Sequence, residues 1–162
     1  MNRDAYESSA GIAAFDTQGL RGVEEKLFDA YFKTPGKMLD LGCGTGRTSV
    51  VLASRGLQVD AVDYSEAMIR KAKEKYPDTS VRFMIMDASE LRFDDATFDY
   101  AFFSYNGLDY LYPAEKRLQA LREIKRVLKP SIRTSLPRTA FMILMTNGSW
   151  RKNSPTGLPT RK

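Results

Sequence analysis

One ten-residue stretch constrains this chain more than any other: Met38-Leu39-Asp40-Leu41-Gly42-Cys43-Gly44-Thr45-Gly46-Arg47. Its apolar start predicts a short strand over residues 37–41, which runs directly into glycines at every second position. A helix is predicted to follow and to end near Ser54, because Arg55-Gly56 closes the pattern. Glycines at the end of a strand let a ligand approach the bare backbone, and the next helix aims its free N–H groups at that ligand. The stretch therefore predicts a ligand-binding strand, loop and helix of an α/β fold.

The spacing of the glycines distinguishes this loop from a nicotinamide-dinucleotide site. That fingerprint is G-x-G-x-x-G, whose third glycine would fall at Arg47 when counted from Gly42, or at Ser49 when counted from Gly44. The pattern present is D-L-G-C-G-T-G, with Asp40 two residues before the first glycine. A nicotinamide-dependent dehydrogenase is therefore disfavoured.

Further strands are predicted over residues 58–63, 81–86 and 98–103, with 140–146 as a candidate fifth strand. Residues 81–86 are apolar almost throughout, which predicts a strand buried on both faces. Asp63 and Asp87 stand at the carboxyl ends of two of these strands, where doubly wound sheets bind ligands. A carboxylate beside the glycine loop can accept hydrogen bonds from both ribose hydroxyls of a nucleoside, whereas Ser65 suits the N-cap of the next helix.

The glycine loop, Asp63, Asp87 and a helix that ends in Leu128-Lys129-Pro130 follow one another in an order that resembles the class I S-adenosylmethionine (SAM)-dependent methyltransferases. The resemblance covers residues 38–130. It implies a doubly wound, Rossmann-like parallel sheet with helices on both faces. It also implies SAM as cofactor, S-adenosylhomocysteine (SAH) as product, and transfer of a methyl group as the reaction.

The same resemblance implies roles for individual residues. Asp63 would bind the ribose, Asp87 would accept from the exocyclic amine of adenine, and the backbone N–H of Ala88 would donate to the ring. Met68 would flank the adenine or pack in the core. The predicted cofactor-binding residues are Asp40, Gly42, Cys43, Gly44, Asp63, Tyr64, Met68, Asp87, Ala88, Ser104 and Asn106. Tyr105, Asn106 and Asp109 are candidates for contact with the methyl acceptor, and no catalytic residue is assigned.

Composition bears on the partners and the location of the chain. The last 32 residues carry six basic and no acidic side chains, which leaves 19 basic and 20 acidic residues in the first 130. A neutral body with a basic tail argues against nucleic acid as the partner, and a small-molecule acceptor is expected. The single cysteine and the absence of an apolar N-terminal or spanning segment predict a cytoplasmic protein off the membrane. The sequence contains no histidine, so no histidine base and no metal site are expected.

The resemblance stops after Pro130. Family members commonly continue with two glycines and a fifth strand, whereas this chain has Ser131 and Ile132, and nothing here supplies the last two strands of the seven-stranded family sheet. A truncated or frameshifted reading frame would look like this. We expect a SAM-binding domain over residues 1–146 with incomplete C-terminal strands, and a basic tail over 147–162. The alternatives are a chain that binds SAM without catalysis, one completed by a partner such as a homodimer formed through an exposed sheet edge, and a nucleic-acid methyltransferase that uses the tail.

Overall fold

The computed structural model describes residues 10, 12–13, 16, 18–32, 35–103, 108, 111–130 and 140–143, the last four by their backbone alone. Its elements are α3 (Gly22–Tyr31), β1 (Lys37–Leu41), α4 (Arg47–Ser54), β2 (Gln58–Asp63), α5 (Glu66–Lys75), β3 (Arg82–Ile85), β4 (Tyr100–Phe103), α6 (Ala114–Val127) and β5 (Ala140–Ile143). The bounds of β1 and β2 are those predicted, because Pro35-Gly36 and Gly42 flank β1, and Gly56 and the helix cap Ser65 flank β2.

The strands form one five-stranded sheet in the order β3-β2-β1-β4-β5. Every pair is parallel; Leu39 of β1 lies opposite Asp60 of β2 and Ala101 of β4. The chain therefore leaves β1 toward one edge of the sheet and later returns to place β4 on its other side. This reversal lies beside the glycine loop, which is where a doubly wound sheet forms its ligand site. The predicted parallel sheet is confirmed, as is the use of residues from 140 onward as a fifth strand.

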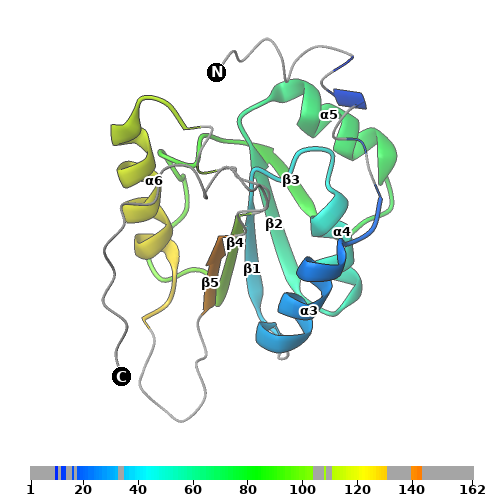
Figure 1. Cartoon of the computed structure of the whole chain (residues 1–162), viewed down its shortest axis with the longest axis horizontal. Coiled ribbons are helices and arrows are strands. Elements are labelled where there is room, and N and C mark those ends of the chain that lie inside the picture. The colour runs from blue at the N-terminus through cyan, green and yellow to red at the C-terminus, as the bar shows by residue number, and fades with distance from the viewer. Residues whose placement is uncertain are drawn as a thin grey trace, which may run out of the picture.

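Helices cover both faces of the sheet, as predicted (Figure 1). On one face Phe28 of α3, Leu52 of α4 and Ile69 of α5 pack on alternate strand residues such as Val59 and Phe102. On the other face Ala120, Ile124 and Val127 of α6 pack on Leu39 and the strand residues that share its orientation. Side chains that alternate between the two cores are the expected consequence of the pleat.

Two expectations about burial are wrong. Residues 81–86 do not form a strand buried on both faces, because β3 is an edge strand and the connection from residue 86 to 99 contains no helix to cover it. Arg82 is exposed as a result, and Ile85 is 45% exposed. The spacing of Leu118, Leu121, Ile124, Lys125 and Leu128 predicts one buried stripe on the helix before Pro130. On α6, Leu118 is instead 52% exposed, because the buried side of the helix is centred on Ala120, Ile124 and Val127.

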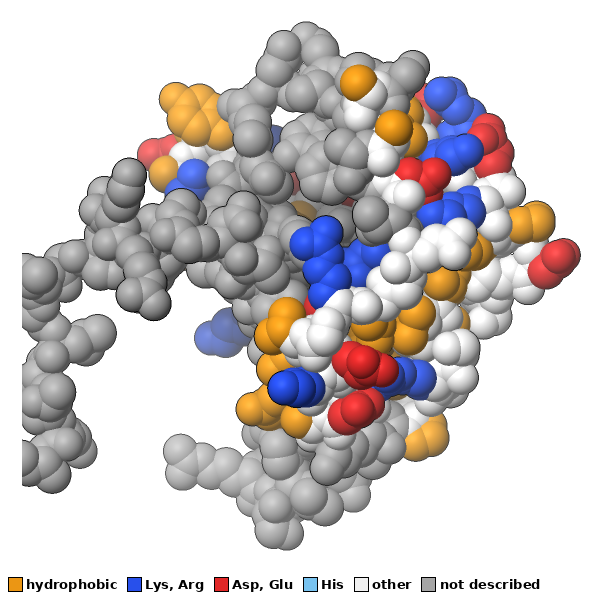
Figure 2. Space-filling view, turned by 45° about the vertical axis from the view of Figure 1, so that its right-hand side comes forward, with side chains coloured by type: hydrophobic (Ala, Val, Ile, Leu, Met, Phe, Trp, Pro, Cys, Tyr) orange, Lys and Arg blue, Asp and Glu red, His pale blue; other side chains and the backbone are white. Residues whose placement is uncertain are grey.

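The described surface carries mixed charge. Figure 2 shows acidic and basic side chains interspersed on the side that α3, α4 and α5 cover. Within the part of the chain that the structure describes, no helix is long and apolar enough to cross a membrane.

Candidate cofactor-binding site

The glycine loop follows β1 and leads into α4. Gly42, Gly44 and Gly46 all have positive φ values, of 61°, 55° and 86°. A Cβ at Gly42 would lie 2.9 Å from the Phe103 ring, and one at Gly46 would lie 2.6 Å from the Phe83 ring. At Gly44 a Cβ would meet no atom of the described residues within 4 Å. The outer two glycines are therefore required by packing, whereas Gly44 borders open space that a ligand can enter.

Asp63 holds this loop in place from the end of β2. Its Oδ2 accepts from the Gly44 N–H at 2.9 Å, and its Oδ1 accepts from the Ser65 N–H at 2.9 Å. Burial raises the pKa of Asp63, while backbone N–H groups of Ser65, Gly44 and Tyr64 oppose that rise. A carboxylate has about four acceptor sites in all, so Asp63 keeps acceptor capacity beyond these backbone contacts. Asp63 thus shapes the loop and retains acceptors for a ligand.

Asp40 lies beneath the loop and is fully buried. Its Oδ2 accepts from the hydroxyls of Thr48 and Ser49, both at 2.7 Å, so it secures the first turn of α4. Among the described atoms its Oδ1 has no hydrogen-bond partner. Burial raises the pKa of Asp40 to about 6, against the lowering effect of these hydroxyls. Its contacts are with α4, and its role toward a cofactor stays a prediction.

Cys43 and Met68 are both buried near this loop. The Cys43 N–H donates to the carbonyl of Val62 at 3.1 Å, which ties the loop to β2. Burial raises the pKa of the Cys43 thiol, and the charges of Asp63 and Asp40 act in the same direction. Ser65 accepts from the Met68 N–H at 3.3 Å, which confirms Ser65 as the N-cap of α5. Met68 is 2% exposed, and its contact with adenine stays a prediction.

Asp87 follows β3 and lies one strand further along the same edge of the sheet. The Met86 N–H donates to the Asp63 carbonyl at 2.9 Å, so the two acidic residues end neighbouring strands. Asp87 Oδ1 accepts from the Ser89 N–H at 2.8 Å and from the Ser89 hydroxyl at 2.7 Å. Its Oδ2 accepts from Lys116 Nζ at 2.8 Å. Burial raises the pKa of Asp87, but the bonds from Lys116 and Ser89 outweigh it and hold that pKa below its usual value.

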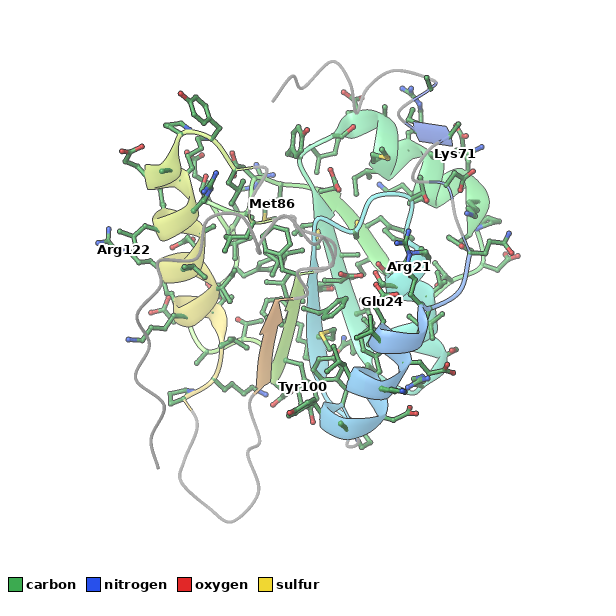
Figure 3. All side chains as sticks on the ribbon, in the orientation of Figure 1. Arg21, Glu24, Lys71, Met86, Tyr100 and Arg122 are labelled. Carbon is green, nitrogen blue, oxygen red and sulfur yellow. The ribbon has the colours of Figure 1, made fainter. Side chains whose placement is uncertain are left out.

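The sequence did not predict the partners of Arg47, the first residue of α4. Arg47 donates to both carboxylate oxygens of Glu24, at 2.6 and 2.7 Å, and to the carbonyl of Gly19 at 2.8 Å. Glu24 is fully buried, and Figure 3 shows it beside Arg21 at the start of α3. The pair fastens α3 to the helix that begins at the glycine loop. Glu24 and Arg47 are 23 residues apart, and no local pattern marks such a contact.

The structure brings most of the predicted set to one edge of the sheet. The glycine loop, Asp63, Asp87 and the buried Ala88 lie at the carboxyl ends of β1, β2 and β3. Tyr64 lies directly after β2 and is half-buried. Ser104 and Asn106 lie outside the described residues, as do the acceptor candidates Tyr105 and Asp109.

Comparison with known proteins decides the family. The sequence profile of a family described as a methyltransferase domain matches residues 38–131, more than half of the chain. The chain belongs to the class I SAM-dependent methyltransferase family. A demethylmenaquinone methyltransferase of Clavibacter sepedonicus is 38% identical over 95 residues, which are 58% of this chain and 37% of that protein. A cypemycin N-terminal methyltransferase of a Streptomyces species is 40% identical over 93 residues, covering 57% of this chain and 38% of its relative.

Solved structures agree with this family assignment. The PH0226 protein of Pyrococcus horikoshii has a TM-score of 0.67 and 32% identity, with 88% of this chain and 66% of that chain covered. A SAM-dependent methyltransferase of Methanosarcina mazei has a TM-score of 0.61 and 29% identity, with 70% of this chain and 55% of that chain covered. The predicted family, fold class and cofactor, SAM, are confirmed. The chain spans about two fifths of the length of the curated relatives that it matches.

Proposed function

We propose that this chain is a SAM-dependent methyltransferase domain that transfers the methyl group of SAM to a small-molecule acceptor. The observation that carries the proposal is the open space at Gly44, bordered by the loop that Asp63 holds. Gly44 has a positive φ, and a Cβ there would meet no described atom within 4 Å. The packing that requires glycine at Gly42 and Gly46 is absent at Gly44, which supports close approach of a nucleoside to the backbone of this residue.

The residues present fit SAM. In the proposal Gly42, Cys43 and Gly44 present backbone to the ligand, Asp63 accepts from the ribose hydroxyls, and Asp87 accepts from the adenine amine. The Ala88 N–H donates to the adenine ring. Both carboxylates keep acceptor capacity after their contacts within the protein are counted. Asp40, Tyr64, Met68, Ser104 and Asn106 complete the proposed set.

Positioning is the main contribution that we assign to the protein. When bound, SAM supplies an electrophilic methyl group on its sulfonium. The glycine loop and the two acidic residues would orient the nucleoside, and correct orientation of two reactants can lower a barrier by about 7–11 kcal/mol. Because the chain contains no histidine, a base for a weakly nucleophilic acceptor would be a carboxylate, a tyrosine or water.

The acceptor is proposed as a class only. The relatives are named for demethylmenaquinone and for the N-terminus of cypemycin, which are chemically unlike. Interspersed charge on the described surface favours a small molecule over nucleic acid (Figure 2). The single cysteine supports a cytoplasmic location as part of this proposal. The proposal also includes a division of the chain into a domain over residues 1–146 and a basic tail over 147–162. It further includes a homodimer formed through an exposed edge of the sheet.

Calorimetric titration of the chain with SAM and SAH tests the cofactor site. We expect saturable binding of one ligand per chain. Lack of binding by a folded chain would overturn the proposal. SAH formation with a demethylated quinol and with a peptide α-amine as acceptors then tests transfer. Binding of SAM without transfer to any acceptor would favour the alternative of a SAM-binding chain that lacks activity or needs a partner.

A further inference from the structure

Lys116 reaches from α6 to the end of β3. Its Nζ donates to Asp87 Oδ2 at 2.8 Å, and the two side chains are 40% and 33% exposed. The pair is therefore partly exposed at the carboxyl end of β3, where a ligand can reach it. Asp87 also raises the pKa of Lys116, so the amine stays an ammonium.

Polar contacts hold α6 against the connection that follows Asp87. Glu123 accepts from the Leu91 N–H at 3.0 Å. Arg126 donates to the carbonyls of Leu91 and Phe93 at 2.9 and 2.8 Å. These bonds hold the second half of α6 against the connection, and Lys116, in the first turn of the same helix, contacts Asp87 where the connection begins.

Most of the hydrogen-bond acceptor positions on the Asp87 carboxylate are occupied. An ionised carboxylate accepts about four hydrogen bonds. Oδ1 takes two from Ser89, and Oδ2 takes one from Lys116. One acceptor position is left on Oδ2, next to the ammonium. Any group that binds Asp87 there therefore meets Lys116 as well.

We propose that Lys116 is a specificity-determining residue for the purine edge that Asp87 binds. This inference rests on the proposed function, in which Asp87 faces the six-position of adenine. The adenine amine donates to Asp87 but offers Lys116 no good acceptor, so the ammonium competes with it. The six-position oxygen of hypoxanthine accepts from an ammonium and is repelled by a carboxylate. Lys116 thus weakens binding of the adenosyl compound and strengthens binding of the inosyl compound. It therefore reduces the preference of the site for adenine over hypoxanthine.

Calorimetric titration of Lys116→Met with SAH and with S-inosylhomocysteine tests this inference. We expect SAH to bind about threefold tighter and the inosyl compound about threefold weaker than in the wild type, so their ratio changes about tenfold. Lys116→Arg keeps a cation and should keep the wild-type ratio. Lys125→Met makes the same chemical change at an exposed site on α6 and should leave both affinities unchanged.

Salt gives a second readout. Because salt screens a half-exposed ion pair, added KCl should move the wild-type ratio toward that of Lys116→Met and leave the variant unaffected. An unchanged ratio in Lys116→Met, with SAH still bound, would overturn the role of Lys116 and leave the proposed function standing. Absence of SAH binding in the folded wild type would overturn both.

Discussion

Arg47 and Glu24 form a two-bond ion pair that joins α4 to α3 directly behind the glycine loop. The N–O distances are 2.6 and 2.7 Å, and the side chains are 11% and 0% exposed. Glu24 Oε2 also accepts from the Arg21 N–H at 2.8 Å, which closes the first turn of α3. A cation at the start of α4 is unfavourable toward the helix dipole, and Glu24 compensates it. The pair therefore fixes both helices at their N-termini.

Glu24→Gln should destabilise the protein strongly, because it removes the buried negative charge to which Arg47 donates both hydrogen bonds. Removal of one partner of a buried pair costs about 3–5 kcal/mol. Urea denaturation measures the change in the free energy of unfolding. Asp29→Asn is the matched control, because Arg55 and Asp29 also join these two helices, at 2.6 Å, but with side chains 30% and 66% exposed. That variant should lose less than about 1 kcal/mol. Equal losses would show that burial of the Glu24 pair is unimportant.

Two of the loop glycines, Gly46 and Gly44, should respond differently to alanine. Gly46→Ala should destabilise the fold, because its Cβ would lie 2.6 Å from the Phe83 ring. Gly44→Ala meets no atom and should cost only the left-handed backbone conformation, about 1–2 kcal/mol. In the proposed site, however, its Cβ enters the ligand space, so SAM affinity should fall tenfold or more. Thermal unfolding and calorimetry separate the two effects, with Gly22→Ala as a control at an open position without positive φ. Normal SAM binding by folded Gly44→Ala would contradict the loop assignment.

Asp63→Ala should weaken SAM binding by about 1–3 kcal/mol, because ribose hydroxyls lose their acceptor. The variant also frees the N–H groups of Gly44 and Ser65, so weaker binding by itself does not prove contact with ribose. The 2′-deoxy analogue of SAH distinguishes the two causes. If Asp63 binds the ribose, loss of the 2′-hydroxyl should weaken binding to the wild type much more than binding to Asp63→Ala. An equal loss in both would assign Asp63 to the loop alone.

Local sequence signals predicted the strands and caps but not the long-range polar contacts. The bounds of β1 and β2 followed from apolar runs that end at glycine or at a helix cap, and Ser65 followed from its place before Glu66. The burial of β3 was mispredicted, since an apolar run does not reveal that its strand lies at an edge and that no helix covers the next connection.

The partners of the site residues depend on how helices dock. Lys116 and Asp87 are 29 residues apart, and their contact exists only because α6 packs beside the end of β3. Asp40 is a similar case. Its spacing from the glycines marked it as part of the loop motif, but no local pattern indicated that the hydroxyls of Thr48 and Ser49 would bind it.

Asp40 should make stability depend on pH. Burial raises its pKa from 3.8 to about 6, so the folded chain holds this proton more tightly than the unfolded chain. The unfolded chain releases the proton first as pH rises, and the free energy of unfolding therefore falls between about pH 4 and pH 6. The shift corresponds to about 3 kcal/mol at most. Above about pH 6 both states are ionised and this contribution is constant.

Asp40→Asn should remove this fall in the free energy of unfolding as pH rises. Urea denaturation at several pH values between about 4 and 7 should show the wild type losing stability relative to the variant as pH rises. Asp99→Asn serves as the opposite control, because Lys129 and the Lys37 N–H outweigh burial and lower the pKa of Asp99. The ionised form of Asp99 stabilises the fold above its unfolded pKa, so its contribution is lost as pH falls below about 4. Parallel pH profiles for the wild type and Asp40→Asn would show that folding does not raise the pKa of Asp40.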